Sequence, residues 1–391
     1  MGANAKAQSW LHKLEEQGML CAFHEEGTGS LTNQTMPVNV DVDAMDPDFI
    51  KSLPITPHDM TSNQIHVHGQ ISEPKNRQLL LDVAREYKDR SWVDVYTRVA
   101  VLLCKKNINL ISGRVLLQIL PSYAYDRDKV LSHARLYAKE FESVEITKDR
   151  FCIKIPSTGP ALSVCSTLEA EGIRTLGTAV FSLPQAIAAS QAGCLYISPY
   201  FNEIRANFNL SLWPNVEDPA TQHTMSARLM QMLEMYRKLY KETGKTQPLI
   251  KNANFISPKE ALAQGEFGVD SATVSAEVLS QLANIPYDVS VRPSGIVDIP
   301  KPQYPEHQNS VSSTPKRLQH LATTDPLAAA DWDGSIASTD VDYLKHNGAE
   351  LEKAIKADPI ASARISDALD VFLKVEGESR ELIEGVMKEL A

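Results

Sequence analysis

Residues 151–199 read FCIKIPSTGPALSVCSTLEAEGIRTLGTAVFSLPQAIAASQAGCLYISP. Three short runs of mostly apolar, often β-branched side chains begin at residues 151, 175 and 195, and two longer helix-compatible stretches separate them. This alternation is typical of βαβ units, in which consecutive strands are parallel and the helices pack on the sheet. The segment therefore predicts an α/β fold with a parallel sheet.

The same alternation extends in both directions along the chain. Helix-compatible stretches, the longest at residues 75–107 and 221–242, lie between short apolar runs. The eight strand candidates are residues 38–43, 56–60, 115–120, 151–155, 175–181, 195–198, 248–255 and 272–274. Eight strands with intervening helices favour a closed barrel over an open sheet, so we expect a (β/α)8 barrel, or TIM barrel.

The remaining segments surround this barrel. Residues 1–36 are polar and amphipathic, which suggests an N-terminal helical extension before a barrel domain at residues 37–292. Residues 293–339 begin as a stretch rich in Pro, Ser, His and Gln, which is typical of a long loop or linker. Residues 340–391 return to a helical pattern without a strand, so we expect additional C-terminal helices packed on the barrel.

Composition argues against several classes of partner. The formal net charge of −10 opposes adhesion to nucleic acid or to an anionic membrane. No stretch approaches the ~18 apolar residues that cross a bilayer, and the N-terminus lacks the apolar core of a signal peptide. The five cysteines include no C-x-x-C pair, which suggests buried thiols in a reducing compartment. We therefore expect a cytoplasmic enzyme without nucleic-acid or membrane partners.

No sequence motif calls for a cofactor or a metal. The chain has neither a G-x-G-x-x-G motif nor a phosphate-binding P-loop, so nothing predicts a dinucleotide or ATP. His66 and His68 could be read as a metal pair, but no acidic or histidine partner stands at ligand spacing. We expect a structural or surface role for these two histidines, no metal and no cofactor.

Lys154 is the residue from which the chemical argument starts. It lies in an apolar strand, FCIKIP, just before the proline that ends it. Burial disfavours the ammonium form, so the pKa of such a lysine falls, and the neutral amine can condense with a ketone to form a Schiff base. In a TIM barrel the carboxyl ends of the strands face the active site. The competing reading is a lysine that reaches bulk solvent from the strand end.

Polar residues recur at the ends of other strands. Asp43 closes the first strand, where a carboxylate could move the proton when a C–C bond forms or breaks. Gln118 is a lone amide in an apolar strand and needs a hydrogen-bond partner if buried, in a polar cavity or in a structural contact. The further candidates at strand ends are Thr178, Ser198, Tyr200 and Asn254.

Together these residues resemble the transaldolase family of class I aldolases, from about residue 38 to residue 283. VDVDAMD (40–46) resembles the first-strand motif that ends in the acid–base aspartate, DMTSN (59–63) a T-x-N motif that brings Asn63 to the substrate, and CIKIPST (152–158) the Schiff-base lysine motif. The adjoining family segment is similar in residue types, order and spacing to residues 168–200, LEAEGIRTLGTAVFSLPQAIAASQAGCLYISPY.

The resemblance implies a transferase of carbohydrate metabolism such as the pentose phosphate pathway, without a cofactor. Lys154 would attack a ketose or ketone donor, and Asp43 would transfer the proton during retro-aldol cleavage. Asn63 and Ser198 would orient the three-carbon, dihydroxyacetone-type unit, and Thr178 would hold a water. The enamine on Lys154 would then attack an aldehyde acceptor. The chain could form a homodimer.

Several positions depart from the family pattern. Gln118 replaces a glutamate and Tyr200 a phenylalanine, and both changes resemble the fructose-6-phosphate aldolase branch. Leu176 replaces an asparagine. In the phosphate pocket, Glu203 replaces an arginine, while Asn254 and Ile256 stand for the expected Ser and Arg. Because phosphate is best bound by Arg or Lys, we expect either an unphosphorylated substrate or a substitute cation. The substitute candidates are Lys251, Lys259 and Arg205.

Three readings therefore stay open. The chain could be a transferase, a free aldolase acting on an unphosphorylated substrate in a specialised biosynthetic pathway, or a catalytically silent barrel that binds a sugar or a protein. A buried lysine is costly to keep without a function, which disfavours the silent barrel.

Overall fold

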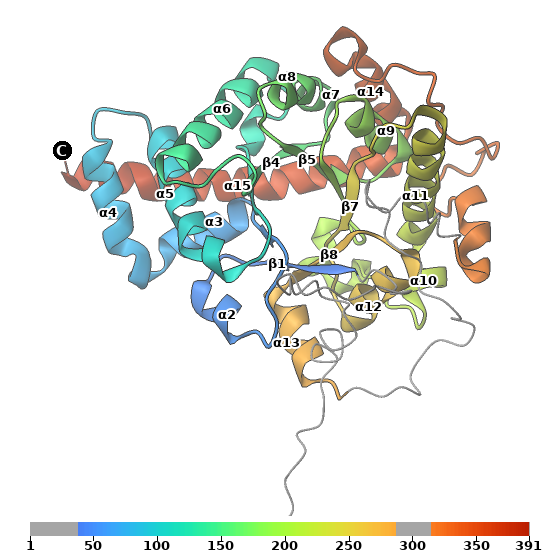
Figure 1. The fold of residues 1–391 in the computed structure, drawn as a ribbon, viewed down its shortest axis with the longest axis horizontal. Coiled ribbons are helices and arrows are strands. Elements are labelled where there is room, and N and C mark those ends of the chain that lie inside the picture. Colours follow the sequence, from blue (N-terminus) through green and yellow to red (C-terminus); the bar gives the residue numbers. More distant parts are fainter. Residues whose placement is uncertain (1–37, 287–313, 391) are drawn as a thin grey trace, which may run out of the picture.

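The computed structural model describes residues 38–286 and 314–390, and in this part of the chain eight parallel strands close into a barrel in sequence order (Figure 1). The predicted (β/α)8 barrel is therefore confirmed. The strands are β1 (Asn39–Asp43), β2 (Met60–Thr61), β3 (Val115–Gln118), β4 (Phe151–Pro156), β5 (Thr175–Val180), β6 (Tyr196–Pro199), β7 (Leu249–Asn252) and β8 (Ser271–Ser275). The expected extension at residues 1–36 lies outside the described residues, as do residues 293–313 of the expected linker.

The barrel closes where β1 pairs with β8. The register runs from Asn39 opposite Ser271 to Asp43 opposite Ser275, so the first and last strands end at the same level. The second strand differs from the sequence prediction, because β2 begins at Met60 and not at residue 56. Pro57 has no backbone N–H and cannot donate to a strand ladder, which accounts for the late start.

Helices surround the barrel. The predicted helical stretch 75–107 divides into α4 and α5, because Ser91 begins a new helix with a capping box shared with Asp94. The helices up to the end of the barrel are α2 (Pro47–Ser52), α3 (Gln64–Ser72), α4 (Arg77–Glu86), α5 (Trp92–Asn107), α6 (Arg127–Ser143), α7 (Gly159–Leu162), α8 (Cys165–Ala170), α9 (Leu183–Gln191), α10 (Pro219–Gln222), α11 (Thr224–Thr243), α12 (Pro258–Phe267) and α13 (Ala276–Asn284). Short 3-10 turns include η3 (Pro121–Tyr123), η4 (Ile204–Asn207) and η5 (Leu210–Leu212).

The apolar core has two parts. The larger part lies between the strands and the surrounding helices. The smaller part fills the barrel interior with Leu116, Cys152, Leu176 and Tyr196. A packed layer of this kind makes the interior of a TIM barrel a core and not a channel. On either side of this layer, toward the carboxyl ends and toward the amino ends of the strands, the interior is polar.

The C-terminal segment packs against the barrel. The 3-10 helix η7 (Lys316–Thr323) contacts α11, so this part of the predicted linker is structured. Helix α14 (Lys345–Ala357) lies on α7 and α9, and the long helix α15 (Pro359–Leu390) crosses α3, α4 and α5 (Figure 1). At the contact of α14 with α7, a Cβ on Gly159 would lie 2.0 Å from the carbonyl oxygen of Gly348. Only glycine fits such a close approach.

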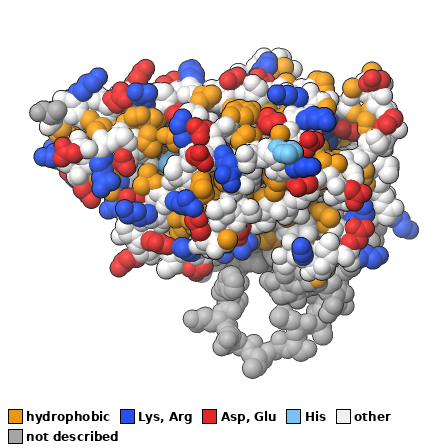
Figure 2. Space-filling view, turned by 90° about the horizontal axis from the view of Figure 1, so that it is seen from above, with side chains coloured by type: hydrophobic (Ala, Val, Ile, Leu, Met, Phe, Trp, Pro, Cys, Tyr) orange, Lys and Arg blue, Asp and Glu red, His pale blue; other side chains and the backbone are white. Residues whose placement is uncertain are grey.

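The surface mixes charges. On the face seen in Figure 2, basic and acidic side chains are interspersed and form no extended area of one sign. Among residues 38–286 and 314–390, no helix combines the length and apolar character needed to cross a membrane. The four described cysteines are free and buried.

Candidate active site

A cavity of about 170 Å³ opens at the carboxyl ends of the strands. Six of the eight residues predicted from sequence line it, although they come from segments far apart in the chain. They are Asp43, Asn63, Lys154, Ser198, Tyr200 and Asn254. Gln118 and Thr178 are not among the lining residues. The catalytic and binding roles of all eight stay predictions, but the geometry limits what each side chain can do.

Lys154 is the buried amine of this cavity. Its side chain projects from β4, and the residue is 4% exposed. Within the described part of the chain, the side-chain amine of Lys154 has no carboxylate at ion-pair distance and makes no hydrogen bond. Burial lowers the pKa of Lys154, and the charge of nearby Asp43 offsets only part of this effect. A lowered pKa increases the fraction of neutral, nucleophilic amine at neutral pH.

Asp43 is held from one side. The hydroxyl of Thr61 donates to Asp43 Oδ1 at 2.5 Å, and Nδ1 of His66 lies 3.6 Å from the same oxygen. Both neighbours therefore engage Oδ1. The second carboxylate oxygen remains for a proton from the substrate, as general acid–base catalysis requires.

Asn63 caps the helix that follows it. Its Oδ1 accepts hydrogen bonds from the backbone N–H groups of Ile65 at 2.9 Å and His66 at 3.4 Å, which is how an N-cap residue satisfies the first turn of a helix. The cap fixes the side chain at the edge of the cavity and leaves its amide nitrogen to donate to a ligand. The structural and proposed binding uses of Asn63 are therefore compatible.

Thr178 and Tyr200 form a pair beside the cavity. Their hydroxyls lie 3.2 Å apart, and burial raises the pKa of Tyr200, so its phenol stays protonated. Strand β5 has a register shift between Thr178 and Val180, with Ala179 at a φ of +58°. Such a bulge redirects side chains near functional sites at a cost in backbone strain. Thr178 does not line the cavity, but its hydroxyl is within hydrogen-bond distance of Tyr200, which does.

Gln118 is opposite Lys154 in the β3–β4 ladder. Its amide nitrogen donates to Oε1 of Gln64 at 2.9 Å, and Gln64 in turn donates to the carbonyl of Ile119 at 2.9 Å. Oε1 of Gln118 is buried and has no hydrogen-bond partner among the described residues. A buried acceptor of this kind can hold a water molecule, which agrees with positioning and not with base catalysis.

Asn254 is less suited to substrate binding than the sequence suggested. Its side chain donates to the carbonyl of Asn202 at 2.8 Å and accepts from Asn207 at 2.7 Å. It also adopts a φ of +66°, a conformation that asparagine tolerates better than most residues. Both polar ends are committed, so its side chain shapes the turn after β7.

Among the lining residues that the sequence did not indicate, His66 and Phe372 bear most on the chemistry. His66 was expected to have a structural or surface role, but it lines the cavity, and its Nδ1 is buried without a hydrogen-bond partner among the described residues. His68, two residues later, contacts Ser379 of α15 at 3.1 Å and does fit a structural role. Phe372 enters the cavity from α15. In the sequence, only the position of His66 three residues after Asn63 suggests that it lies near the cavity. Nothing in the sequence suggests this for Phe372.

Comparison with known proteins decides the family. The model of the transaldolase/fructose-6-phosphate aldolase family matches residues 40–332, which include every residue of the cavity except Phe372. The chain belongs to this family.

Solved structures similar to this transaldolase-family barrel include two proteins of low identity. An IMP dehydrogenase/GMP reductase-like protein from Corynebacterium glutamicum is 11% identical with a TM-score of 0.38, over 82% of this chain and 85% of that protein. A putative lactate oxidase from Pediococcus acidilactici is 9% identical with a TM-score of 0.33, over 94% of this chain and 87% of that protein.

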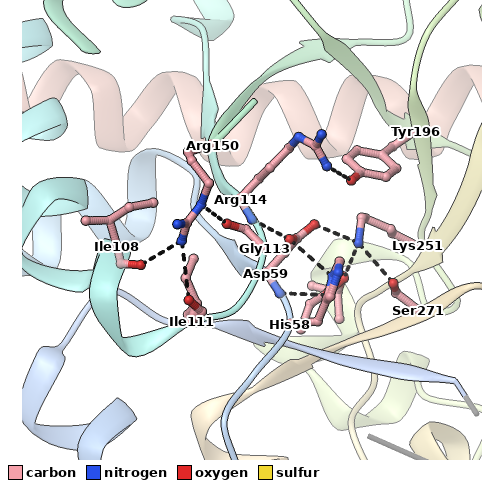
Figure 3. Close-up of polar contacts among 12 residues, drawn as sticks. His58, Asp59, Ile108, Ile111, Gly113, Arg114, Arg150, Tyr196, Lys251 and Ser271 are labelled. Atoms are coloured by element: carbon pink, nitrogen blue, oxygen red, sulfur yellow. Dashed lines mark hydrogen bonds and ion pairs between the residues drawn. The ribbon is translucent and has the colours of Figure 1, made fainter. Parts of the chain in front are cut away.

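A second buried lysine lies near the opposite end of the same barrel. Nζ of Lys251 is 2.9 Å from a carboxylate oxygen of Asp59 and 2.9 Å from the hydroxyl of Ser271 (Figure 3). It is also 2.9 Å from a carboxylate oxygen of Asp41. It also lies 4.4 Å from the ring centre of Tyr196. Burial alone would lower the pKa of Lys251, but the two carboxylates reverse the effect and raise it. Lys251 is therefore a structural cation.

This cluster corrects one sequence prediction and bears on metal binding. Lys251 cannot substitute for the family's phosphate-binding arginine, because it is buried at the wrong end of the barrel. Asp41, His58 and Asp59 lie close enough to share a metal ion. Lys251 already supplies the positive charge between the two carboxylates, so the donor set does not favour a metal there.

The other two candidates for a substitute phosphate-binding cation form ion pairs at the surface. Lys259 pairs with Glu217 at 2.6 Å, and Arg205 pairs with Asp367 of α15 at 3.3 Å. Neither lines the cavity, where Lys154 is the only lysine or arginine from residues 38–286 and 314–390. The cavity as described therefore lacks the guanidinium or ammonium pair that normally binds a phosphate.

Proposed function

We propose that this transaldolase-family enzyme makes or breaks a C–C bond by aldol chemistry through a Schiff base on Lys154, transferring or releasing a dihydroxyacetone-type unit. The observation that carries the proposal is the state of Lys154, which is buried, unpaired within the described residues, and in one cavity with Asp43. Burial lowers the pKa of Lys154, which favours the neutral amine that attacks a ketone.

The chemical steps use groups already described. The Lys154 amine adds to the ketone carbon of the donor, and loss of water gives an iminium ion. Asp43 takes the proton of the hydroxyl on the carbon being cleaved, the C–C bond breaks, an aldehyde leaves, and the electron pair stays on the donor as an enamine. In transfer, the enamine carbon attacks a second aldehyde, and protonated Asp43 returns the proton to the new alkoxide. Hydrolysis of the iminium frees Lys154.

Tyr200 and Gln118 bear on whether the unit is transferred or released. Burial raises the pKa of Tyr200 and keeps its phenol protonated, and this proton can pass to the enamine carbon. The proton that Asp43 gained in the cleavage then restores the phenol, and water releases the free ketone. Gln118 has no ionisable group and can only position water. These features favour the alternative of a free aldolase, and the lack of a phosphate-binding cation in the cavity favours an unphosphorylated substrate in a specialised pathway.

Borohydride reduction in the presence of donor tests the proposal. Wild-type protein is incubated with dihydroxyacetone or fructose 6-phosphate, reduced, and measured by intact-mass and peptide-mass spectrometry. We expect one adduct on Lys154. Lys154→Met should form none, because a thioether cannot condense with a ketone.

The matched control is Lys259→Ala, which removes an exposed lysine outside the cavity and should leave the adduct unchanged. Absence of an adduct in folded wild-type protein, with every donor tried, would overturn the proposal in favour of a silent ligand-binding barrel. An adduct retained by Lys154→Met would assign the chemistry to another amine.

A further inference from the structure

One wall of the cavity is apolar. Ile204 and Phe208 come from the segment after β6, Phe255 from the turn after β7, Phe372 from α15, and Ile65 from α3. These side chains lie beside the hydrogen-bonding groups of Asp43, Asn63 and Ser198 in the same cavity. The polar groups suffice for a small hydroxylated donor, and the apolar wall is left for a different chemical group.

Phe208 is unusual within this wall. It is 70% exposed, whereas Phe255 and Phe372 are 3% and 2% exposed. Leu210, two residues later, is 62% exposed. Large apolar side chains that remain in water next to a cavity are typical of a binding surface, because covering them with an apolar ligand is favourable. Phe208, which lines the cavity, therefore extends its apolar wall to the solvent.

The same region has little to offer an anionic group. Among the described residues, Lys154 is the only lysine or arginine that lines the cavity, and a Schiff base would occupy it. Arg205 is adjacent to Ile204 in sequence but pairs with Asp367. A terminal phosphate or carboxylate on the acceptor would therefore lose its water shell without gaining a charged partner in the cavity.

We propose that this wall is the acceptor subsite and that it binds an unphosphorylated, apolar aldehyde with an aryl or short alkyl group. The inference rests on the proposed Schiff-base function and specifies its second substrate. With dihydroxyacetone as donor, Asp43 takes the proton lost when the iminium on Lys154 becomes the enamine. The enamine carbon then forms the new C–C bond with the aldehyde carbon, and the resulting alkoxide takes that proton back from Asp43. Water then hydrolyses the iminium and releases a β-hydroxy ketone.

The volume of the cavity agrees with this division. Apolar cavities of about 150 Å³ accommodate a molecule the size of benzene. The present cavity, about 170 Å³, holds a three-carbon donor and the reacting end of an aldehyde, but not two complete sugars. The rest of the acceptor then lies against Phe208 at the edge of the cavity.

An acceptor competition tests the subsite. With dihydroxyacetone as donor, kcat/KM is measured for benzaldehyde, hexanal and glyceraldehyde 3-phosphate by product mass. We expect the apolar aldehydes to exceed the phosphorylated one by at least about tenfold. Phe208→Ala should lower kcat/KM for the apolar aldehydes about tenfold, mainly through KM, and Phe208→Arg should shift the preference toward the phosphorylated acceptor.

The matched control is Tyr125→Ala, which removes another exposed aromatic ring (58%) that does not line the cavity and should change no ratio. Preference of the wild type for glyceraldehyde 3-phosphate, lost in Arg205→Ala, would overturn the proposal and assign a phosphate site to Arg205. Borohydride trapping of dihydroxyacetone is run in parallel on each variant. An adduct on Lys154 without an apolar preference removes the acceptor proposal alone, whereas no adduct removes the Schiff-base function as well.

Discussion

The barrel contains two buried lysines in opposite electrostatic surroundings. Lys154, near the carboxyl ends of the strands, is 4% exposed, and Lys251, nearer the amino ends, is 1% exposed. Lys251 has two carboxylates at 2.9 Å, and its pKa is raised. Lys154 has no ion-pair partner among the described residues, and its pKa is lowered.

The difference shows that burial alone does not make a lysine reactive. Both residues lose their water shell, which disfavours the charged ammonium. For Lys251, the attraction of the two carboxylates stabilises the ammonium by more than burial destabilises it. Only for the lysine without such a pair does burial increase the share of neutral, nucleophilic amine. Asp43 is near enough to raise the pKa of Lys154, but it is not within ion-pair distance.

The sharpest test of this comparison is to replace each lysine by methionine. Lys251→Met leaves Asp41 and Asp59 buried without their cation, and removal of one partner from a buried ion pair costs about 3–5 kcal/mol. Lys154→Met replaces an unpaired amine by an apolar side chain of similar length, so the free energy of unfolding should stay unchanged or rise by about 1–2 kcal/mol. Urea unfolding of both variants measures the contrast.

The triple variant Lys251→Met, Asp41→Asn and Asp59→Asn serves as the control. It removes the uncompensated charges together with the cation and should recover part of the lost stability. Equal destabilisation by the two single lysine replacements would contradict the comparison, because it would mean that Lys154 also contributes as a structural cation.

A smaller effect should appear in the pH dependence of stability through His58. Its Nδ1 lies 3.2 Å from Asp59 and 3.7 Å from Asp41. Burial would lower the pKa of His58, but these carboxylates outweigh it and raise the pKa to about 9. A raised folded-state pKa stabilises the fold below the unfolded value of about 6.5, and this contribution is lost as the pH rises through about 9. Its size is on the order of 3 kcal/mol, because one pKa unit corresponds to about 1.4 kcal/mol.

His58→Gln should therefore be less stable than the wild type at about pH 6, and the gap should close by about pH 9.5. The readout is the difference in unfolding free energy between the two proteins, so that other titrating groups cancel. One such group is Asp270, whose pKa burial raises to about 7. A gap that is constant over this range would show that His58 acts by packing and not by charge.

The sequence predicted the features that depend on local pattern. Runs of β-branched residues alternating with helical stretches indicated the closed barrel. The FCIKIP strand indicated Lys154, and the resemblance of DMTSN to a family motif indicated Asn63. Lys251 could not be separated from Lys154 in this way, because both lie in apolar strands. Their positions along the barrel depend on the register of the strands around it, in which Lys251 is opposite Ser271 and Lys154 is opposite Gln118.

Features that depend on distant segments were beyond the sequence pattern. Phe372 lines the cavity only because α15 docks across helices that precede it by more than 200 residues. Helix α3, with the sequence QIHVHGQIS, has three β-branched residues and a glycine and shows no clear helical stripe. Without that helix, the two histidines could not be assigned to different faces.

His66 gives the last and smallest expected effect, and it concerns the environment of Asp43. Burial lowers the pKa of His66, so the ring is neutral at neutral pH despite the pull of Asp43. A neutral imidazole 3.6 Å from the carboxylate can move closer and share the proton that Asp43 gains when the C–C bond breaks. His66→Leu should lower kcat about tenfold with little change in KM, and borohydride trapping on Lys154 should persist.

Two further variants separate this positioning role from simple packing. His66→Asn keeps a polar atom near the place of Nδ1 and should restore part of kcat, whereas leucine cannot. His68→Leu removes the neighbouring histidine, whose contact is with Ser379 of α15, and should leave kcat unchanged. If Leu and Asn at position 66 are equally slow, or if His68→Leu is as slow as His66→Leu, the imidazole acts through the packing of α3. Proton transfer at this end of the barrel would then depend on Asp43 without assistance from His66.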